Sequence, residues 1–373
     1  AQSRNQIRAG LQMFLAFSAV ALAALVLPAY YTDANARDNY AGVASYVDVV
    51  GDPDRDVVLL NAPGQQEVWS YYDPGLPMIA LPETRPVDVQ VTRAALADGI
   101  AGKQRLFALF WATDESDPDN MVETWLDRET FKGPESWHGN MRFVTYFVPT
   151  ALACRAVDID AANFADLFAL EERCSDSADN AVAAGDALAV GLQWRPLSET
   201  PTRYKISLQL LNEQNQVVAQ HDGEPGGGST PTSTWQPGQL VSDNHALWVP
   251  FGTPPGRYRL LLTVYDLQTG ERLATSAGDA LVLGEVLVTR PVALAPAAVL
   301  PMQHRSGISL GSVDLLGYSQ HRKGFAHAPE TSVQPGDIIE LVVWWQTPDP
   351  LPATWPEDNS VILSLGDEER TMP

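Results

Sequence analysis

An apolar run near the N-terminus constrains this chain more than any other feature. Between Leu11 and Leu27 only Gln12 and Ser18 are polar. With its flanks the run covers residues 10–31, close to the ~20 apolar residues with which an α-helix crosses about 30 Å of hydrocarbon. The run therefore predicts a transmembrane helix that contacts the lipid bilayer.

The residues on either side of the run predict its orientation. Arg4 and Arg8 precede it, and the pair Tyr30-Tyr31 follows it. Basic residues mark the cytoplasmic end of a membrane helix, and aromatic residues gather at the membrane interface. We therefore predict a single-pass protein of the cell membrane, with a cytoplasmic N-terminus and the bulk of the chain extracytoplasmic.

A cleaved signal peptide is the alternative, because Ala34-Asn35-Ala36 resembles an A-x-A processing site. The chain also begins with Ala rather than Met. We therefore expect either a processed chain or a fragment of a longer protein, and favour the fragment.

Length and charge limit the function. At roughly 100–200 residues per domain, 373 residues predict two or three domains. Acidic residues outnumber basic ones, 46 to 24, which gives a net charge of -22. Nucleic acid requires a basic surface, so we expect no nucleic-acid partner.

The chain contains only two cysteines, Cys154 and Cys174. They are too few for a disulfide framework and lack the spacing of a metal site. In an oxidising compartment they would form one disulfide, whereas two free buried thiols would leave the same pattern.

Residues 34–155 alternate apolar bursts with helical patterns, which predicts βαβ units and a mostly parallel sheet. We expect a small Rossmann-like α/β domain here, with residues 1–33 forming the membrane helix and its short cytoplasmic end. No G-x-G-x-x-G or G-K-[ST] loop is present, so nothing predicts a nucleotide. The expected strands lie at residues 57–61, 78–81, 106–111 and 142–148, and the expected helices at 35–50, 92–100 and 120–127.

The remaining sequence is rich in short strands and Gly/Pro turns, which indicates β-sandwiches. Gly185-Asp186 precedes Trp194 by the same interval as Gly336-Asp337 precedes Trp345. This repeat predicts two copies of a strand that ends in a core tryptophan. The expected fold class is thus multidomain: a transmembrane helix, an α/β domain, a β-sandwich over 156–293 and a second, partial β-sandwich over 294–373.

Several strings resemble the C-terminal part of large bacterial membrane glycosyltransferases. These are family 39-like enzymes of the GT-C type, related to protein O-mannosyltransferases and aminoarabinose transferases, which take sugar from polyprenyl-phosphate donors. No catalytic residue carries over, because the catalytic acids of such enzymes lie in a first extracytoplasmic loop that has no counterpart here. The matching strings include Asp56-Val57-Val58-Leu59-Leu60-Asn61, Leu315-Leu316-Gly317-Tyr318, Gln334-Pro335-Gly336-Asp337 and Trp344-Trp345-Gln346.

Two polar strings are candidate sites. Asp117 and Asp119 could present oxygens to Ca²⁺, but the spacing of a calcium loop is absent and both suit a helix N-terminus. We therefore predict no cofactor, with Ca²⁺ as the alternative. Gly307-Ile308-Ser309-Leu310-Gly311 matches the nucleophile-elbow pattern, but its surroundings predict strands instead of the required strand–turn–helix.

Tryptophan is abundant, with ten residues in the chain. Sugars stack on exposed aromatic rings, so the candidate glycan-binding residues are those on loop-like segments: Trp235, Trp248 and Trp355. For each of them packing in a core or rim is the competing reading, because tryptophan is highly buried on average.

The resemblance implies a non-catalytic, extracytoplasmic region of a polyprenyl-phosphate-sugar-dependent membrane glycosyltransferase, binding acceptor or glycan. The alternative is a membrane-anchored structural or interaction subunit that binds other membrane protein subunits. Whether the parent protein is an enzyme stays open, since no convincing catalytic motif is present in this chain.

Overall fold

The structure is a computed structural model, and the chain divides into two compact units, residues 1–294 and 295–373. The described residues are 2–32, 38–61, 63–72, 74–176, 180–291, 293–310, 313–322, 331–347, 361–365 and 368–372.

The N-terminal run forms helix α1 (Gln2–Thr32). Among the described residues, no helix combines the length and apolar character needed to cross a membrane. The predicted transmembrane helix over 10–31 is therefore wrong, and with it the membrane localisation and the membrane part of the predicted fold class. The stretch between Gln12 and Pro28 has 15 residues, all apolar except Ser18. At 1.5 Å per residue it spans about 22 Å, less than the ~30 Å of a hydrocarbon core.

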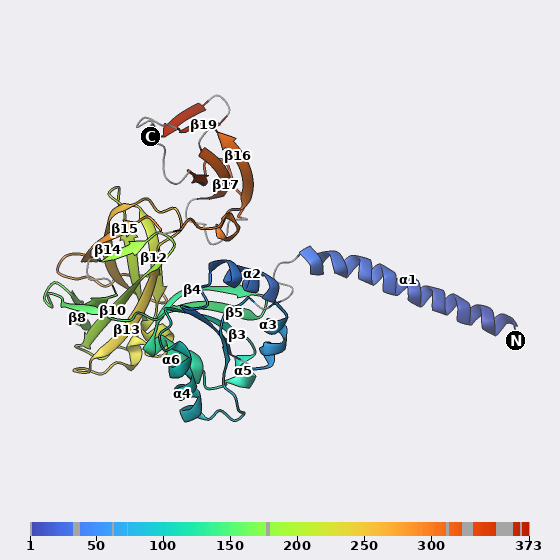
Figure 1. The fold of residues 1–373 in the computed structure, drawn as a ribbon, viewed down its shortest axis with the longest axis horizontal. Coiled ribbons are helices and arrows are strands. Elements are labelled where there is room, and N and C mark those ends of the chain that lie inside the picture. The colour runs from blue at the N-terminus through green and yellow to red at the C-terminus, as the bar shows by residue number, and fades with distance from the viewer. Residues whose placement is uncertain are drawn as a thin grey trace. The chain divides into compact units, whose positions relative to one another are not determined.

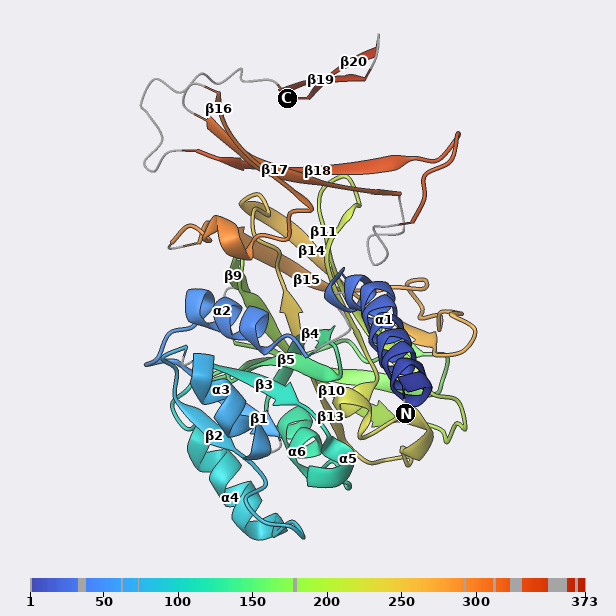
Figure 2. The same ribbon diagram turned by 90° about the vertical axis from the view of Figure 1, so that its right-hand side faces the viewer.

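The first unit contains a ten-stranded sheet with the order β2-β1-β3-β5-β4-β13-β10-β8-β6, in which β7 pairs with β8 (Figures 1 and 2). Its α/β half has three parallel strands followed by an antiparallel hairpin of β4 and β5. These strands are β1 (Asp56–Asn61), β2 (Met78–Ala80), β3 (Arg105–Phe110), β4 (Phe131–His138) and β5 (Met141–Phe147).

Helices cover both faces of this half of the sheet (Figure 2). Strand β1 shows why: Val57 and Leu59 point into the core beneath α4 and α6, whereas Val58 and Leu60 point into the core beneath α2 and α3. A strand buried on both faces reads as an unbroken apolar run. The helices are α2 (Tyr40–Val50), α3 (Gln66–Tyr72), α4 (Val89–Ile100), α5 (Thr113–Ser116) and α6 (Met121–Glu129), with a 3-10 turn η1 at Pro63–Gln65.

Strand β4 was not predicted from the sequence. Its residues include Lys132, Pro134 and Glu135, and its second half is mostly exposed, so it shows no apolar burst. Because β4 runs antiparallel to β5, the expected mostly parallel, Rossmann-like layout is only partly formed.

The second half of the ten-stranded sheet is one layer of a β-sandwich. Its strands are β6 (Ala153–Ala156), β7 (Asn163–Phe164), β8 (Phe168–Ser175), β10 (Ala187–Pro196) and β13 (Val241–Trp248). The facing five-stranded sheet has the order β12-β11-β14-β15-β9. Its strands are β9 (Ala181–Ala183), β11 (Tyr204–Leu211), β12 (Val217–Gly223), β14 (Gly256–Asp266) and β15 (Leu281–Thr289), with 3-10 turns η2 (Pro225–Gly228) and η3 (Thr232–Thr234) nearby in the chain.

One apolar core fills the space between these two layers, with Trp194 fully buried at its centre. The two halves of the large sheet join where β13 pairs in parallel with β4, at His245 and Lys132. The ten-stranded sheet therefore contains strands from both sides of the domain boundary that the sequence predicts between residues 155 and 156.

The second unit contains an antiparallel three-stranded sheet of β16 (His304–Leu310), β17 (Val313–Arg322) and β18 (Ile339–Gln346), preceded by the 3-10 turn η4 (Ala297–Val299). A two-stranded sheet of β19 (Val361–Leu365) and β20 (Glu368–Met372) follows. Both copies of the Gly-Asp repeat lead into a strand, β10 and β18. Their tryptophans differ, because Trp194 is fully buried and Trp345 is 37% exposed.

Candidate functional site

The predicted glycan-binding tryptophans lie in packed surroundings. Trp235 is only 4% exposed, packs against Trp194 and Phe168, and donates its Nε1–H to the Thr230 carbonyl. Trp248 is half-buried and packs against two phenylalanine rings. Trp355 lies outside the described residues.

The predicted calcium ligands lie at the start of α6. The buried carboxylate of Asp117 accepts hydrogen bonds from the backbone N–H groups of Met121 and Val122, at 3.0 and 2.9 Å. Asp119 is exposed, and both aspartates border a cleft of about 440 Å³. Asp117 thus satisfies free N–H groups at a helix N-terminus, which is the usual role of aspartate there.

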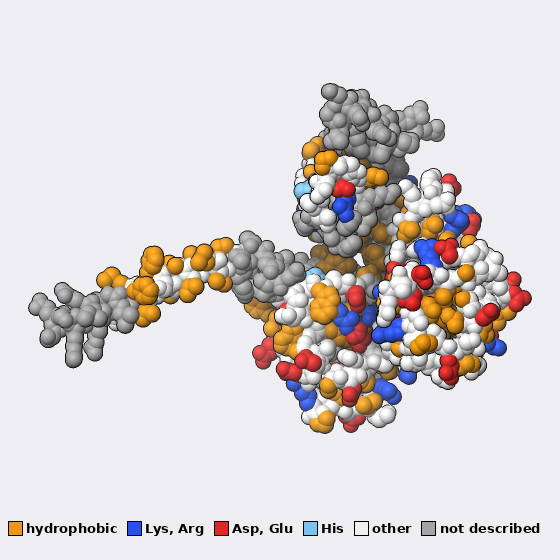
Figure 3. Space-filling view, turned by 180° about the vertical axis from the view of Figure 1, so that it is seen from behind, with side chains coloured by type: hydrophobic (Ala, Val, Ile, Leu, Met, Phe, Trp, Pro, Cys, Tyr) orange, Lys and Arg blue, Asp and Glu red, His pale blue; other side chains and the backbone are white. Residues whose placement is uncertain are grey.

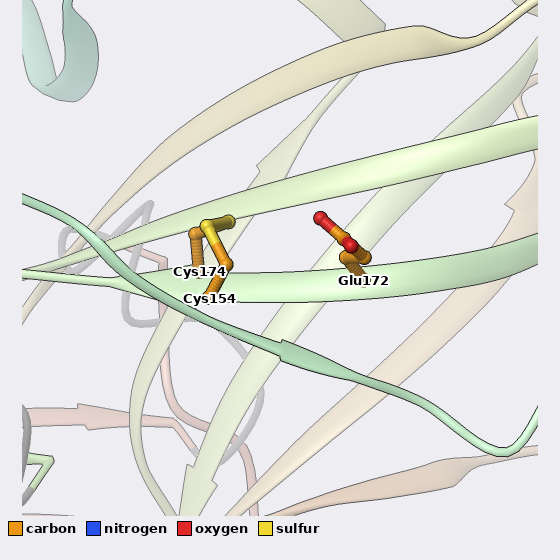
Figure 4. A group of neighbouring side chains, drawn as sticks. All are labelled: Cys154, Glu172 and Cys174. Atoms are coloured by element: carbon orange, nitrogen blue, oxygen red, sulfur yellow. A yellow bond between two sulfur atoms is a disulfide. The ribbon is translucent and has the colours of Figure 1, made fainter.

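The two cysteines are joined by a disulfide across the paired strands β6 and β8 (Figure 4). Glu172 lies beside them, and these three residues are the one cluster of three or more His, Cys, Asp or Glu side chains, in the described part of the chain, whose ligand atoms lie close enough to share a metal ion. Because both sulfurs are bonded to each other, neither is a thiolate, and the group does not offer a metal its usual sulfur ligands.

Ser309 lies on β16, which pairs with β17 in an antiparallel hairpin. Its hydroxyl donates to the Asp314 carboxylate, at 2.5 Å. A nucleophile elbow needs a strand followed by a helix, so this setting does not match one.

A different pair of tryptophans borders a cleft of about 640 Å³, here called the tryptophan cleft. Trp111 is 37% exposed and Trp137 is 63% exposed. The cleft lies beyond the carboxyl end of β3, the edge at which open α/β sheets bind their ligands. Its lining residues are Phe110, Trp111, Ala112, Thr113, Asp114, Asn120, Glu123, Trp137, Asn140 and Arg142.

Hydrogen bonds and ring contacts hold the cleft in shape. The Asp38 carboxylate accepts the Trp111 Nε1–H at 2.8 Å and the Asn140 backbone N–H at 2.7 Å. On the other side, the Arg142 guanidinium lies 4.8 Å from the ring centre of Phe110 and 5.9 Å from that of Trp137. These contacts orient both tryptophan rings before any ligand arrives.

Ion pairs neutralise the charges at the floor of the cleft. Arg142 pairs with Glu123, and with Glu135 at 3.1 Å, while Lys132 pairs with Glu123 at 2.9 Å. Burial alone would raise the pKa of Glu123, yet its bonds to Arg142 and Lys132 lower that pKa below its usual value. Glu123 is therefore an ionised acceptor at neutral pH.

The backbone beside the cleft adopts an uncommon conformation. Ala112 and Asn120, which flank the segment containing α5, both have φ of 49°. For alanine this left-handed region costs about 1–2 kcal/mol, whereas asparagine adopts it readily. The strained residue is therefore Ala112, and strained positions of this kind cluster at functional sites.

A second polar cluster lies where β4, β12, β13 and η2 meet, in a cleft of about 310 Å³ here called the junction cleft. The buried Asp243 accepts a hydrogen bond from His245 Nε2 at 2.7 Å and another from the Gly226 backbone N–H at 3.0 Å. The Nδ1 atom of His245 lies 3.1 Å from the Nδ1 atom of His221. Burial, followed by the neighbouring His245, lowers the pKa of His221 to about 3.

Asp127 of α6 lies beneath the same region. Its carboxylate accepts the Tyr146 hydroxyl at 2.9 Å and lies 3.7 Å from Lys132 Nζ. Burial raises the pKa of Asp127 to about 6, against the opposing effect of Lys132. Asp127 thus titrates well above an ordinary aspartate.

The surface around these sites is mixed in charge. Figure 3 shows Lys and Arg side chains scattered among Asp and Glu on the visible face. The expectation of no nucleic-acid partner stays a prediction.

Sequence reasoning passed over Trp111 and Trp137. Trp111 directly follows the apolar burst of β3. Its place at the carboxyl end of a strand could therefore have marked it as a candidate ligand-binding residue. Trp137 lies on β4, which has no recognisable pattern, and its partner Arg142 comes from the next strand.

No protein-family model matches the chain, and no curated protein matches it. Among solved structures, the chain is similar to a Pseudomonas fluorescens alkylpurine DNA glycosylase, AlkC, bound to DNA with an abasic site analogue. The match has 12% identity and a TM-score of 0.19, and covers 30% of this chain and 28% of the glycosylase. A similarity this small supports no conclusion about fold or function.

Proposed function

We propose that this chain binds carbohydrate in the tryptophan cleft, as a glycan- or acceptor-binding region. The observation that carries the proposal is the pair Trp111 and Trp137, two exposed indole rings on one cleft. The C–H faces of a pyranose ring pack on such rings, which offer large apolar area with little conformational freedom to lose.

The polar groups of the cleft suit sugar hydroxyls. Asn120, Asn140 and Thr113 supply neutral donors and acceptors, and Glu123 supplies an ionised acceptor. Small sets of placed polar groups on an aromatic lining are typical of small-molecule sites. Because the Arg142 charge is shared with Glu123 and Glu135, the cleft favours neutral sugars over acidic ones.

The ion pairs also argue for binding rather than bond cleavage. A glycosidase needs one carboxyl group that keeps its proton near neutral pH, to protonate the leaving oxygen. The pKa of Glu123 is instead lowered, mainly through its bond to Arg142, which opposes the effect of burial. The parent glycosyltransferase implied by the sequence resemblance stays a prediction.

The test is calorimetric titration of the protein with neutral oligosaccharides built from mannose, glucose, galactose and N-acetylglucosamine. We expect at least one series to bind, and Trp137→Ala to weaken that binding about two- to tenfold, because a stacked aromatic ring contributes about 0.5–1.5 kcal/mol. Trp137→Tyr should retain part of the affinity.

Tyr71→Ala is the matched control, because Tyr71 is an 83% exposed aromatic residue that does not line the tryptophan cleft. It should bind like the wild type. Unchanged affinity in Trp137→Ala, or no binding by any of the four series, would overturn the proposal.

A further inference from the structure

The two histidines of the junction cleft face each other through the same ring atom. His221 lies on β12 of the five-stranded sheet and His245 on β13 of the ten-stranded sheet, with their Nδ1 atoms 3.1 Å apart. The rings are nearly perpendicular, at 70°, with centroids 5.1 Å apart. Both side chains border the junction cleft.

The hydrogen bonds assign the protons on these rings. His245 Nε2 carries a proton, because it donates to the Asp243 carboxylate, and its Nδ1 therefore presents a lone pair. His221 then donates from Nδ1 to His245 Nδ1. In the described part of the chain, His221 Nε2 makes no hydrogen bond, so its proton can move to that atom and free Nδ1.

With both Nδ1 lone pairs free, the two atoms have the spacing of neighbouring ligands on one metal ion. Transition metals bind imidazole nitrogen at about 2.0–2.1 Å, so two nitrogens 3.1 Å apart subtend an angle of about 95–100° at the metal. That angle lies between the values of octahedral and tetrahedral sites.

The surroundings of His245 match those of a metal ligand. Histidine ligands commonly donate their second N–H to a carboxylate, which fixes the ring and strengthens the ligating nitrogen. Asp243 occupies this position at 2.7 Å, and is itself held by the Gly226 N–H. Its fully buried charge lies directly behind the pair and offsets part of an incoming cation's charge.

We propose that His221 Nδ1 and His245 Nδ1 bind a divalent transition-metal ion of the Zn²⁺ or Ni²⁺ class, with Asp243 as the positioning residue for His245. Water and ligand groups entering the junction cleft would fill the remaining positions. The charges that line this cleft are largely paired, Lys132 with Glu123, Glu135 with Arg142 and Glu224 with Arg203, while Asp222 and Lys205 add one charge of each sign.

The experiment is calorimetric titration of untagged, chelator-treated protein with Zn²⁺ and with Ni²⁺. We expect one equivalent to bind, no detectable binding at this site in His221→Ala, and a 10- to 100-fold weaker affinity in Asp243→Asn. His138→Ala, a half-buried histidine on β4 outside the junction cleft, should bind like the wild type.

Nitrogen NMR of the histidine rings in the wild-type protein keeps the proposal testable if a variant fails to fold. Zinc should shift Nδ1 of both His221 and His245, and leave His245 Nε2 protonated. Absence of zinc and nickel binding by the wild type, equal affinity in His221→Ala, or a zinc-induced shift at other histidines alone would overturn the site.

Discussion

At the junction of the two sheet halves, one buried carboxyl group, that of Asp127, has a raised pKa. Asp127 is nearly buried, receives one hydroxyl hydrogen bond, and lies within 3.7 Å of a lysine that also pairs with Glu123. Its carboxyl group has lost more solvation than these neighbours restore, and burial accordingly raises its pKa to about 6.

Asp127→Asn should remove this pH dependence. A carboxyl group whose folded pKa lies above its unfolded value of about 3.9 adds stability below pH 4, and that stability is lost as the pH rises to 6. Asparagine keeps the acceptor for Tyr146 and does not titrate. Relative to the wild type, the variant should gain about 1–3 kcal/mol of unfolding free energy between pH 4 and pH 7.5.

Urea unfolding at several pH values measures this difference. If the difference in unfolding free energy between variant and wild type stayed constant from pH 4 to pH 7.5, Asp127 would not be the titrating group.

Residue-scale roles were only partly predictable from sequence. The choice of helix N-terminus over calcium for Asp117 rests on a local rule, and the structure places its carboxylate on two backbone N–H groups of α6. Which of the ten tryptophans are exposed depends on contacts between residues distant in the chain, and these cannot be read from the local sequence. Trp235 reads as a loop residue, yet it is enclosed by Phe168 and Trp194, which are distant in the chain.

At the scale of elements, the short turn η2 connects the two buried polar groups. The Gly226 N–H donates to Asp243, while Gly227 packs so closely on α6 that an added Cβ would lie 2.1 Å from Asp127 Oδ2. The run of glycines from Gly226 to Gly228 thus allows the backbone to approach two carboxylates, a property of the segment as a whole.

Gly227→Ala should therefore destabilise the protein more than Gly228→Ala. Both glycines have positive φ, so both substitutions cost the left-handed strain, but only Gly227 has an atom of Asp127 in the way, since nothing lies within 4 Å of a Cβ on Gly228. We expect the difference to be about 1–3 kcal/mol, the usual penalty for overpacking. Chemical unfolding of the two variants side by side gives this number, and equal losses would refute the close contact.

Elements with strong periodicity were predictable and those without it were not. The apolar bursts at 57–61, 78–81, 106–111 and 142–148 correspond to β1, β2, β3 and β5, because strands covered on both faces must be apolar throughout. Strand β4 was missed because its hairpin partner β5, and not its own composition, keeps it extended.

At the scale of the first unit, the main feature that the sequence did not predict is the continuity of the ten-stranded sheet. It depends on the pairing of β13 with β4, whose register joins residues far apart in the chain, His245 and Lys132. No local pattern encodes such a pairing. The same long-range contact creates the junction cleft. The separation of His221 and His245 in the sequence therefore could not predict that their side chains face each other.

The second unit shows the limit of reasoning from repeats. The shared Gly-Asp turn and tryptophan predict a strand in both places, and both β10 and β18 form. The repeat does not predict burial, which depends on the layers above. Trp194 lies between two sheets and is fully buried, whereas Trp345 stays exposed.

The central claim, that the tryptophan cleft binds carbohydrate, is tested most directly by nitrogen–proton NMR of the ten indole groups during a glycan titration. The account predicts that the Trp137 and Trp111 indole signals shift in a saturable manner, while those of the buried Trp194 and Trp235 stay in place. Saturable binding with unchanged Trp137 and Trp111 signals would place the site elsewhere and contradict the account.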